Sequence, residues 1–255
     1  MKLVISIWFL CFTSQVAAQQ EIIDTNFHVY LLIGQSNMAG RGIPDAESKK
    51  INERVLMLDS ENHWVPATDP VHFDKPAMVG VGPAIAFANS MLENNSKIKI
   101  GLIPCAVGGS PIKAWEPGAV YSGRFHPYED ALSRAQLAMK TGVLKGIIWH
   151  QGESDNDSAL ATVYIKKLDT LINRLRTDLK QPGLPFVAGE LGYFIRIDFI
   201  NKIIHQLPAQ VTHTAVVSAK DLTHKGDQLH FDTPSARELG KRYAAAMKQL
   251  QMNGH

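Results

Sequence analysis

Ser36 is the first residue whose surroundings indicate chemistry. It lies in the segment Gly34 to Gly40, directly after an apolar run, with glycines two residues before it and four residues after it. A serine on a sharp strand-to-helix turn is exposed at the top of a sheet, near helix-terminal N–H groups, and this placement suits a nucleophile. The segment is not Gly-x-Ser-x-Gly, because Met38 stands where the second glycine would be. A serine that only caps the following helix is the alternative interpretation.

A nucleophilic serine needs a general base, and that base needs an acid to orient it. The segment from Asp227 to His230 offers both residue types within one turn, before an apolar-periodic segment near the end of the chain. This spacing allows Asp227 to bond one imidazole nitrogen of His230 while the other nitrogen points toward Ser36. The pairing favours a catalytic histidine over an ordinary surface histidine.

An acyl-transfer site also needs donors for the developing oxyanion. The doublet Gly108-Gly109 follows an apolar run, and glycine there lets a backbone N–H approach a substrate without an intruding side chain. The Ser36 N–H is a second candidate donor, and the side-chain N–H of Gln151 is a third. A plain tight turn is the alternative interpretation of the glycine doublet.

His150 and Glu153 share the same polar segment and pose the question of a metal site. A zinc site needs three or four convergent ligands, and neither a His-Glu-x-x-His motif nor a cysteine cluster accompanies these two residues. We therefore expect no metal and no other cofactor.

The elements that position these residues alternate along the chain. Five short apolar runs predict strands covered on both faces: Phe27–Ile33, Ile98–Pro104, Leu144–His150, Pro185–Leu191 and His213–Ser218. Patterns with three-to-four spacing predict helices between and after them: Pro83–Leu92, Pro127–Lys140, Ala159–Leu179, Asp198–Leu207 and Ser235–Leu250. This alternation predicts an α/β protein, a three-layer α/β/α sandwich with a five-stranded, mostly parallel sheet. Residues 41–80 are less regular and are interpreted as a partly β insertion near the site.

Composition narrows the class of protein. The chain has 255 residues, 45% of them hydrophobic and 20% charged, with a formal net charge of +2. This balance is that of a globular protein, and no Lys/Arg run exceeds two residues, so no nucleic-acid partner is expected.

The first eighteen residues have the features of a secretory signal peptide. Lys2 supplies the positive charge, Leu3 to Phe12 form an apolar stretch, and Val16 to Ala18 offer small residues for cleavage after Ala18. The apolar stretch is shorter than the roughly 18 residues that a membrane span needs. We therefore expect a secreted or periplasmic protein, a single domain over residues 19–255, with no membrane contact after cleavage. The oligomeric state is not predicted.

Four motifs together resemble a known superfamily. Gly34-Gln35-Ser36-Asn37, Gly108-Gly109, His150-Gln151-Gly152-Glu153 and Asp227-x-x-His230 resemble the ordered signature segments of the SGNH hydrolases. They are most similar to the branch that contains carbohydrate esterase family six and the sialate O-acetylesterase-like proteins, over about Val29 to Tyr243.

The resemblance implies a flavodoxin-like fold and hydrolysis of O-acetyl esters on carbohydrate. It implies Ser36 as nucleophile, His230 as general base and Asp227 as the orienting acid. It implies an oxyanion hole made by the N–H groups of Ser36 and Gly109 and by the Gln151 side chain. A glutamate matching Glu153 has been proposed to support the histidine in related proteins, so Glu153 is the alternative acid, or it holds Gln151 or the serine loop.

Acetylated xylan is the substrate favoured by this resemblance, and acetylated sialic acid is the alternative. Arg41 and Trp115 are candidates for substrate binding, because both lie in segments expected near the site and the aromatic face of Trp115 suits a sugar ring. A non-catalytic carbohydrate-binding protein on the same fold would lack Ser36, His230 or the oxyanion donors, and all of these are present. A lipase or thioesterase would favour an apolar groove, whereas the residues after Ser36 are polar.

Overall fold

A computed structural model describes residues 23–196 and 198–253. The predicted signal peptide, residues 1–18, lies outside the described residues. None of the helices in the described ranges is both long and apolar enough to cross a lipid bilayer.

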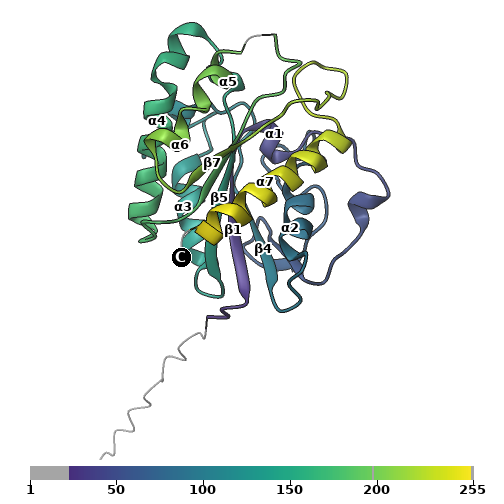
Figure 1. Cartoon of the computed structure of the whole chain (residues 1–255). Helices are drawn as coiled ribbons and strands as arrows, with labels where there is room; N and C mark the ends of the chain where they lie inside the picture. Colours follow the sequence, from purple (N-terminus) through teal and green to yellow (C-terminus); the bar gives the residue numbers. More distant parts are fainter. Residues whose placement is uncertain (1–22, 197, 254–255) are drawn as a thin grey trace, which may run out of the picture.

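One twisted sheet forms the centre of the fold (Figure 1). Its strands are β1 (Phe27–Gly34), β2 (Val55–Leu58), β3 (Trp64–Pro66), β4 (Lys99–Pro104), β5 (Val143–His150), β6 (Phe186–Gly189) and β7 (Thr214–Val217). They lie in the order β3-β2-β4-β1-β5-β6-β7. Every neighbouring pair is parallel except β2 and β3. The prediction of a mostly parallel sheet is therefore confirmed.

The predicted number of five strands was wrong, because the sheet has seven. All five predicted strands are present, and the two extra strands, β2 and β3, come from the irregular segment 41–80. These two strands span only four and three residues at one edge of the sheet, and half-exposed side chains interrupt their apolar pattern. The five predicted strands lie in the order 2-1-3-4-5 of flavodoxin-like sheets.

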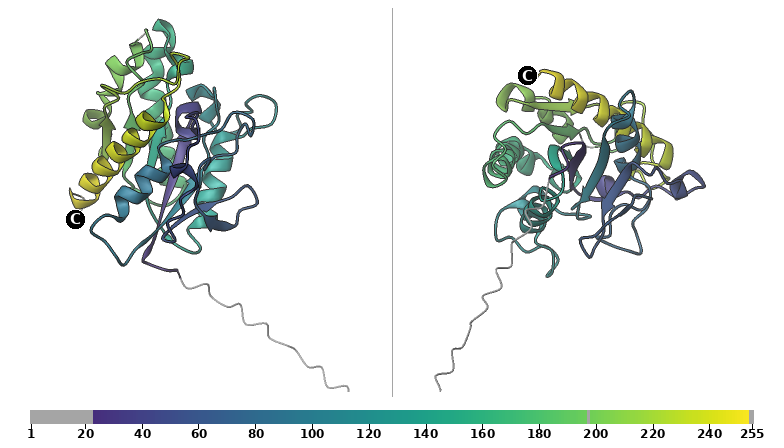
Figure 2. Two further views of the ribbon diagram at one scale, coloured as in Figure 1. Left: turned by 90° about the vertical axis from the view of Figure 1, so that its right-hand side faces the viewer. Right: turned by 90° about the horizontal axis from the view of Figure 1, so that it is seen from below.

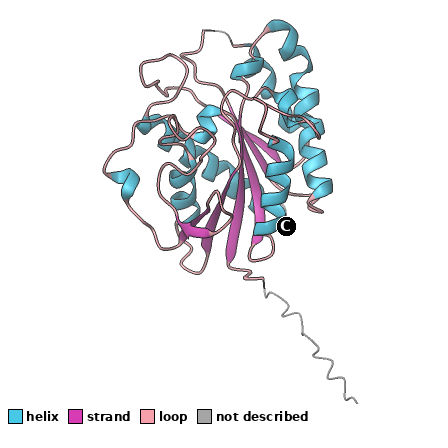
Figure 3. Ribbon diagram, turned by 180° about the vertical axis from the view of Figure 1, so that it is seen from behind, coloured by secondary structure: helices cyan, strands magenta, loops and turns pink. Residues whose placement is uncertain are grey.

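Helices cover both faces of the sheet (Figures 2 and 3). The longer ones are α2 (Ala84–Leu92), α3 (Pro127–Ala138), α4 (Ser158–Asp178) and α7 (Thr233–Asn253). The short ones are α1 (Ser36–Ala39), α5 (Phe199–Ile204) and α6 (Leu207–Gln210), with 3₁₀ turns η1 (Glu47–Lys49), η2 (Ile112–Trp115) and η3 (Glu153–Asp155). One helix was predicted over Asp198–Leu207, but the chain forms two. Pro208 explains the break, because it has no N–H for the carbonyl of Ile204 and its ring clashes with that carbonyl.

The buried strand β1 divides the core into two halves. Its residues Val29 and Leu31 pack in one apolar cluster with helices α3, α4 and α5. The alternating residues Tyr30 and Leu32 pack in the other cluster with helices α2 and α7. Because successive side chains of a strand point to opposite faces, a strand between two helical layers is apolar on both of them, as β1 is from Val29 to Ile33.

The strand register brings the candidate residues to one edge. Gly34 at the end of β1 pairs with His150 at the end of β5, so the segments that begin at Gln35 and at Gln151 leave the sheet side by side. The neighbouring strand β4 ends at Pro104 and leads into Gly108-Gly109. In open α/β sheets, ligands bind beyond the carboxyl ends of the strands, where the strand order reverses. That point lies between β1 and β5 here.

Candidate active site

Ser36, His230 and Asp227 form a hydrogen-bonded chain. Ser36 is the first residue of α1, and its Oγ lies 3.0 Å from Nε2 of His230. Nδ1 of the same imidazole lies 2.7 Å from Oδ2 of Asp227. The serine and the histidine lie 194 positions apart in the sequence, and the fold joins them at the edge of the sheet.

The loop before α7 fixes His230 through the other oxygen of Asp227. Oδ1 of Asp227 accepts the backbone N–H of Leu229 at 3.0 Å and that of His230 at 2.8 Å. Gln228 at the tip of this turn has φ of 56°. One carboxylate thus orients both the backbone and the ring of the histidine, as an Asx-turn does.

The electrostatics of the pair favour a charged aspartate and a neutral imidazole. Burial raises the pKa of Asp227, but hydrogen bonds from His230 and Leu229 outweigh it and lower that pKa to about 2. Burial lowers the pKa of His230 below its ordinary 6.5, against the opposing effect of Asp227. Because the carboxylate only accepts, Nδ1–H donates to it and Nε2 keeps its lone pair for the serine hydroxyl. This arrangement can remove the Ser36 proton.

Two backbone donors near Ser36 are available to a ligand. The N–H groups of Ser36 and Gly109 donate to no protein acceptor within the described ranges. Hydrogen bonds hold the backbone on both sides of the Gly109 N–H. The Gly108 N–H donates to Asp74 Oδ2 at 2.7 Å, and the Gly109 carbonyl accepts a bond from Ser154 Oγ at 2.9 Å. Gly109 has φ of 81°, in the left-handed region that favours glycine.

Gln151 does not fit its predicted role as an oxyanion donor. Its Nε2 lies 2.6 Å from Asp155 Oδ2, 3.1 Å from Gln35 Oε1 and 3.2 Å from the Ser110 carbonyl. The side chain is fully buried, and three protein acceptors surround the two hydrogens of its amide. Gln151 instead ties together the segments that follow β1, β4 and β5.

Asn37 is a site residue that the sequence analysis missed. Its Nδ2 donates to Glu153 Oε1 at 2.6 Å and to the Leu229 carbonyl at 3.1 Å. Its Oδ1 accepts the N–H of Phe231 at 3.1 Å. Asn37 therefore holds the residues on both sides of His230, while Glu153 contacts Asn37 and makes no hydrogen bond to that histidine. No local pattern reveals such a contact, because the partners lie more than 100 residues away.

The side chains of Glu153 and His150 are both buried. Burial raises the pKa of Glu153 to about 7 and lowers that of His150 to about 3. His150 Nε2 lies 3.9 Å from Glu153 Oε1, but the imidazole is neutral near neutral pH, so the contact is not an ion pair. In the part of the chain that the structure describes, no group of three or more His, Cys, Asp or Glu side chains has the arrangement of a metal site.

Arg41 lies inside the protein rather than on a substrate-binding surface. Its residue exposure is 4%, and its guanidinium donates to Asp74 Oδ2 at 3.1 Å and to the Gly40 carbonyl at 2.7 Å. The predicted contact with substrate does not fit this burial. The ion pair instead supports Asp74, which holds the Gly108 N–H.

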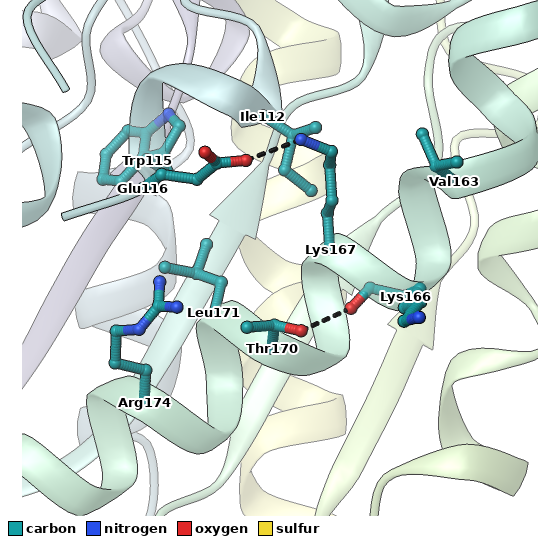
Figure 4. A pocket seen from close by; sticks show the side chains of 9 residues that line it. All are labelled: Ile112, Trp115, Glu116, Val163, Lys166, Lys167, Thr170, Leu171 and Arg174. Carbon is teal, nitrogen blue, oxygen red and sulfur yellow. Dashed lines mark hydrogen bonds and ion pairs between the residues drawn. The ribbon is translucent and has the colours of Figure 1, made fainter.

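Trp115 is also buried, with 1% exposure. Its ring packs edge-on against Trp149 at 5.2 Å, and its Nε1 donates to Ser110 Oγ at 3.1 Å. It borders a pocket of about 310 Å³ between η2 and α4, where Glu116 and Lys167 form an ion pair of 2.6 Å (Figure 4). Packing within the core covers the Trp115 ring, and this burial does not fit the predicted contact with a sugar.

The fold and the site define a class: an α/β protein with a Ser–His–Asp arrangement at the carboxyl edge of a mostly parallel sheet. Residues 26–249 match the family described as carbohydrate esterase, sialic acid-specific acetylesterase, and the chain belongs to this family. Membership confirms the predicted resemblance at the level of a carbohydrate esterase.

Known relatives agree with this assignment. A probable carbohydrate esterase from Arabidopsis thaliana is 37% identical over 243 residues, which cover 86% of this chain and 89% of the relative. A solved structure of a protein from Arabidopsis thaliana has a TM-score of 0.78 and 34% identity, over 89% of this chain and 99% of that one. The structure of NanS has a TM-score of 0.71 at 19% identity, over 91% of this chain and 100% of that one, and shows the shared fold.

Proposed function

We propose that this protein is a secreted serine esterase that removes O-acetyl groups from carbohydrate. The observation that carries the proposal is the continuous chain of contacts from Ser36 Oγ through the His230 imidazole to the Asp227 carboxylate, at 3.0 and 2.7 Å. Nucleophile, general base and orienting acid stand in hydrogen-bond reach of one another, which is the arrangement that acyl transfer requires. Membership in a carbohydrate esterase family supports the substrate class.

The proposed reaction has two steps. His230 Nε2 takes the Ser36 proton as Oγ attacks the acetyl carbonyl, and the N–H groups of Ser36 and Gly109 stabilise the oxyanion. The bond from the carbonyl carbon to the sugar oxygen breaks, and that oxygen takes the proton from His230. Water then attacks the acetyl-Ser36 ester, with His230 again as the base, and releases acetate and free Ser36.

Acetylated xylan remains the proposed substrate, on the resemblance given by the sequence motifs. Acetylated sialic acid is the second candidate, and the description of the matching family favours it. The two differ in charge, because sialic acid carries a carboxylate and a xylan backbone is neutral. Export is proposed from Lys2, the apolar stretch that follows it and the cleavage site after Ala18.

Acetate release from acetylated xylan and from acetylated sialic acid, measured side by side, tests the substrate class. We expect release from at least one of the two, with a higher kcat/KM on xylan. Binding of either carbohydrate without any release would instead indicate a non-catalytic carbohydrate-binding protein. N-terminal sequencing of the exported protein tests secretion, with Gln19 expected as the first residue.

A further inference from the structure

Arg41 and Asp74 form a buried ion pair between the two segments that carry the proposed oxyanion donors. Nη2 of Arg41 lies 3.1 Å from Oδ2 of Asp74, and the two side chains are 1% and 2% exposed. Withdrawal of two charges from water is costly, and replacement of a buried ion pair by apolar side chains is often neutral or stabilising. The contacts of the pair, rather than its effect on stability, therefore indicate what it does.

On one side, the pair is joined to the turn that carries Ser36. The N–H of Gly40, the residue directly after α1, donates to the Ser36 carbonyl at 2.9 Å. The carbonyl of Gly40 accepts a bond from Nη1 of Arg41 at 2.7 Å. The guanidinium therefore holds the end of the short helix whose first residue is the proposed nucleophile.

On the other side, the pair is joined to the glycine loop. Oδ2 of Asp74, the oxygen that contacts Arg41, also accepts the Gly108 N–H at 2.7 Å. Gly108 precedes Gly109 in the chain, so this bond fixes one end of the segment that carries the Gly109 N–H. A single carboxylate oxygen thus joins the glycine loop to the guanidinium.

The position of Gly108 is a second, independent sign that the pair and the loop fit each other. A β-carbon on Gly108 would lie 2.4 Å from Nη2 of Arg41 and 2.9 Å from Oδ2 of Asp74. Gly108 is not one of the glycines with positive φ among the described residues, so its backbone conformation would accept a side chain. The close approach of the ion pair is therefore what requires glycine here.

We propose that Arg41 and Asp74 are positioning residues that fix the two oxyanion donors, the N–H groups of Ser36 and Gly109, relative to each other. This inference rests on the proposed esterase function and deepens it. An oxyanion hole is effective when its donors are in place before charge develops on the substrate. A buried ion pair holds them there, because neither partner can move away without leaving the other charge buried and alone.

The charge of Arg41 is felt at the active site. Burial is the main cause of the lowered pKa of His230, and the positive charges of Lys225 and Arg41 lower it further, against the opposing effect of Asp227. The guanidinium therefore lies within electrostatic range of the proposed base, although protein covers it.

The double variant Arg41→Met/Asp74→Leu tests this role. It removes both charges together, so no unpaired ion is left inside the protein, and the fold should persist. The Gly108 N–H and the Gly40 carbonyl nevertheless lose their contacts with the pair.

Arg176→Met is the matched control, because Arg176 is 5% exposed and Arg41 is 4% exposed. The Arg176 guanidinium donates to backbone carbonyls of Leu184, Thr212 and His213. These residues precede the strands β6 and β7, at the edge of the sheet opposite to the active site. The control therefore loses a buried guanidinium of similar burial far from the oxyanion donors.

We expect the double variant to lose about 10²–10³-fold in kcat, with KM little changed, because one oxyanion donor is displaced. The loss should be similar on acetylated xylan and on 4-nitrophenyl acetate, since the donors bind the ester oxygen and not the sugar. Arg176→Met should lower the melting temperature and keep its kcat. A double variant with the kcat of this control, or with a change in KM alone, would overturn the proposal.

Gly108→Ala keeps both charged residues and decides the matter if the double variant does not fold. Its methyl group must displace the guanidinium or the carboxylate, and either movement loosens the link between the two donors. We expect kcat to fall by at least about tenfold, less than for the full loss of a donor. Gly183→Ala is the control, because no atom lies within 4 Å of the added group. Equal kcat values of these two variants would overturn the proposal.

Amide hydrogen exchange at Gly108 separates this proposal from the esterase proposal, because it needs no catalysis. The Gly108 N–H should exchange at least about tenfold faster in the double variant than in wild type or Arg176→Met. This result with a wild type that hydrolyses no ester would contradict the esterase alone. An active wild type whose Gly108 exchange is the same in the double variant would contradict the role of the pair alone.

Discussion

The Asn37 side-chain nitrogen lies 2.6 Å from Glu153 Oε1, and Asn37 is the residue that follows the proposed nucleophile. The same amide contacts the Leu229 carbonyl and the Phe231 N–H, on the two sides of His230. Because Asn37 follows Ser36 in the chain, one side chain sets the distance between the nucleophile and its base. Glu153 in turn holds that side chain in place.

Asn37→Ala should weaken both folding and catalysis. The change leaves the Leu229 carbonyl, the Phe231 N–H and the Glu153 carboxyl oxygen without their partner. We therefore expect the free energy of unfolding to fall by about 2–4 kcal/mol. The kcat should fall more than KM rises, because the histidine loses its position and no substrate contact is removed. Denaturant unfolding and steady-state kinetics measure the two effects. Asn52→Ala is the control, because it removes the contacts to Asn89 and to the Arg54 N–H but none to the residues around His230, so kcat should not change. An unchanged kcat in Asn37→Ala would contradict a positioning role.

The orienting acid is tested by comparing Asp227→Asn with Glu153→Gln. Asp227→Asn should lower kcat by about 10⁴-fold, the loss typical of this triad position, because the imidazole loses its carboxylate partner. Glu153→Gln should stay within about tenfold of wild type, since the Gln oxygen still accepts the bond from Asn37. The reverse order of losses would make Glu153 the acid that supports His230.

The activity should fall in acid with the titration of one group. His230 must be neutral to accept a proton, and burial lowers its pKa below the ordinary 6.5. The neutral form is therefore lost only as the pH falls through this lowered value, while Asp227, with a pKa of about 2, stays charged. The pH profile of kcat/KM, which reports the free enzyme, should fall with unit slope below a midpoint lower than 6.5. A midpoint above 6.5 would rule out this protonation scheme, and melting temperatures across the series control for acid unfolding.

Gly109→Ala should impair catalysis through the backbone. The added methyl group would lie 2.9 Å from the Tyr121 hydroxyl at a residue with φ of 81°, so the backbone is strained and either the tyrosine side chain or the peptide that carries the N–H must move. Loss of one oxyanion donor costs about 10²–10³-fold in kcat. Gly118→Ala is the matched control, with φ of 76° and open space around the added group. It should share the backbone strain and keep its kcat. Similar kcat values for the two variants would remove Gly109 from the oxyanion hole.

Much of the fold was predictable because its strands are buried on both faces. Runs such as Phe27–Ile33 and Leu144–His150 are mostly apolar, with His28 and Lys145 near their starts, and this signal locates each strand to within a few residues. The strands β2 and β3 were missed because short edge strands have mixed burial and no such run. The break between α5 and α6 was visible in principle, because Pro208 stands four residues after Ile204.

The site was predictable where neighbours in the sequence act together. Asp227 and His230 are three residues apart, so their contact could be inferred from spacing. The direction of the Gln151 amide could not, because three distant acceptors determine it. The burial of Arg41 and Trp115 depends likewise on Asp74 and Trp149, which only the folded chain brings near them.

Acetate release by Ser36→Ala, compared with wild type on the same acetylated xylan, is the most direct test of the central claim. The Ser36 hydroxyl lies 3.0 Å from Nε2 of the proposed base, and the alanine side chain has no oxygen with which to attack. We expect a loss of about 10⁶-fold in kcat with the fold unchanged, as removal of a triad serine produces, together with no acetylated protein in a rapid acid quench. Wild-type release of acetate by Ser36→Ala would contradict the account.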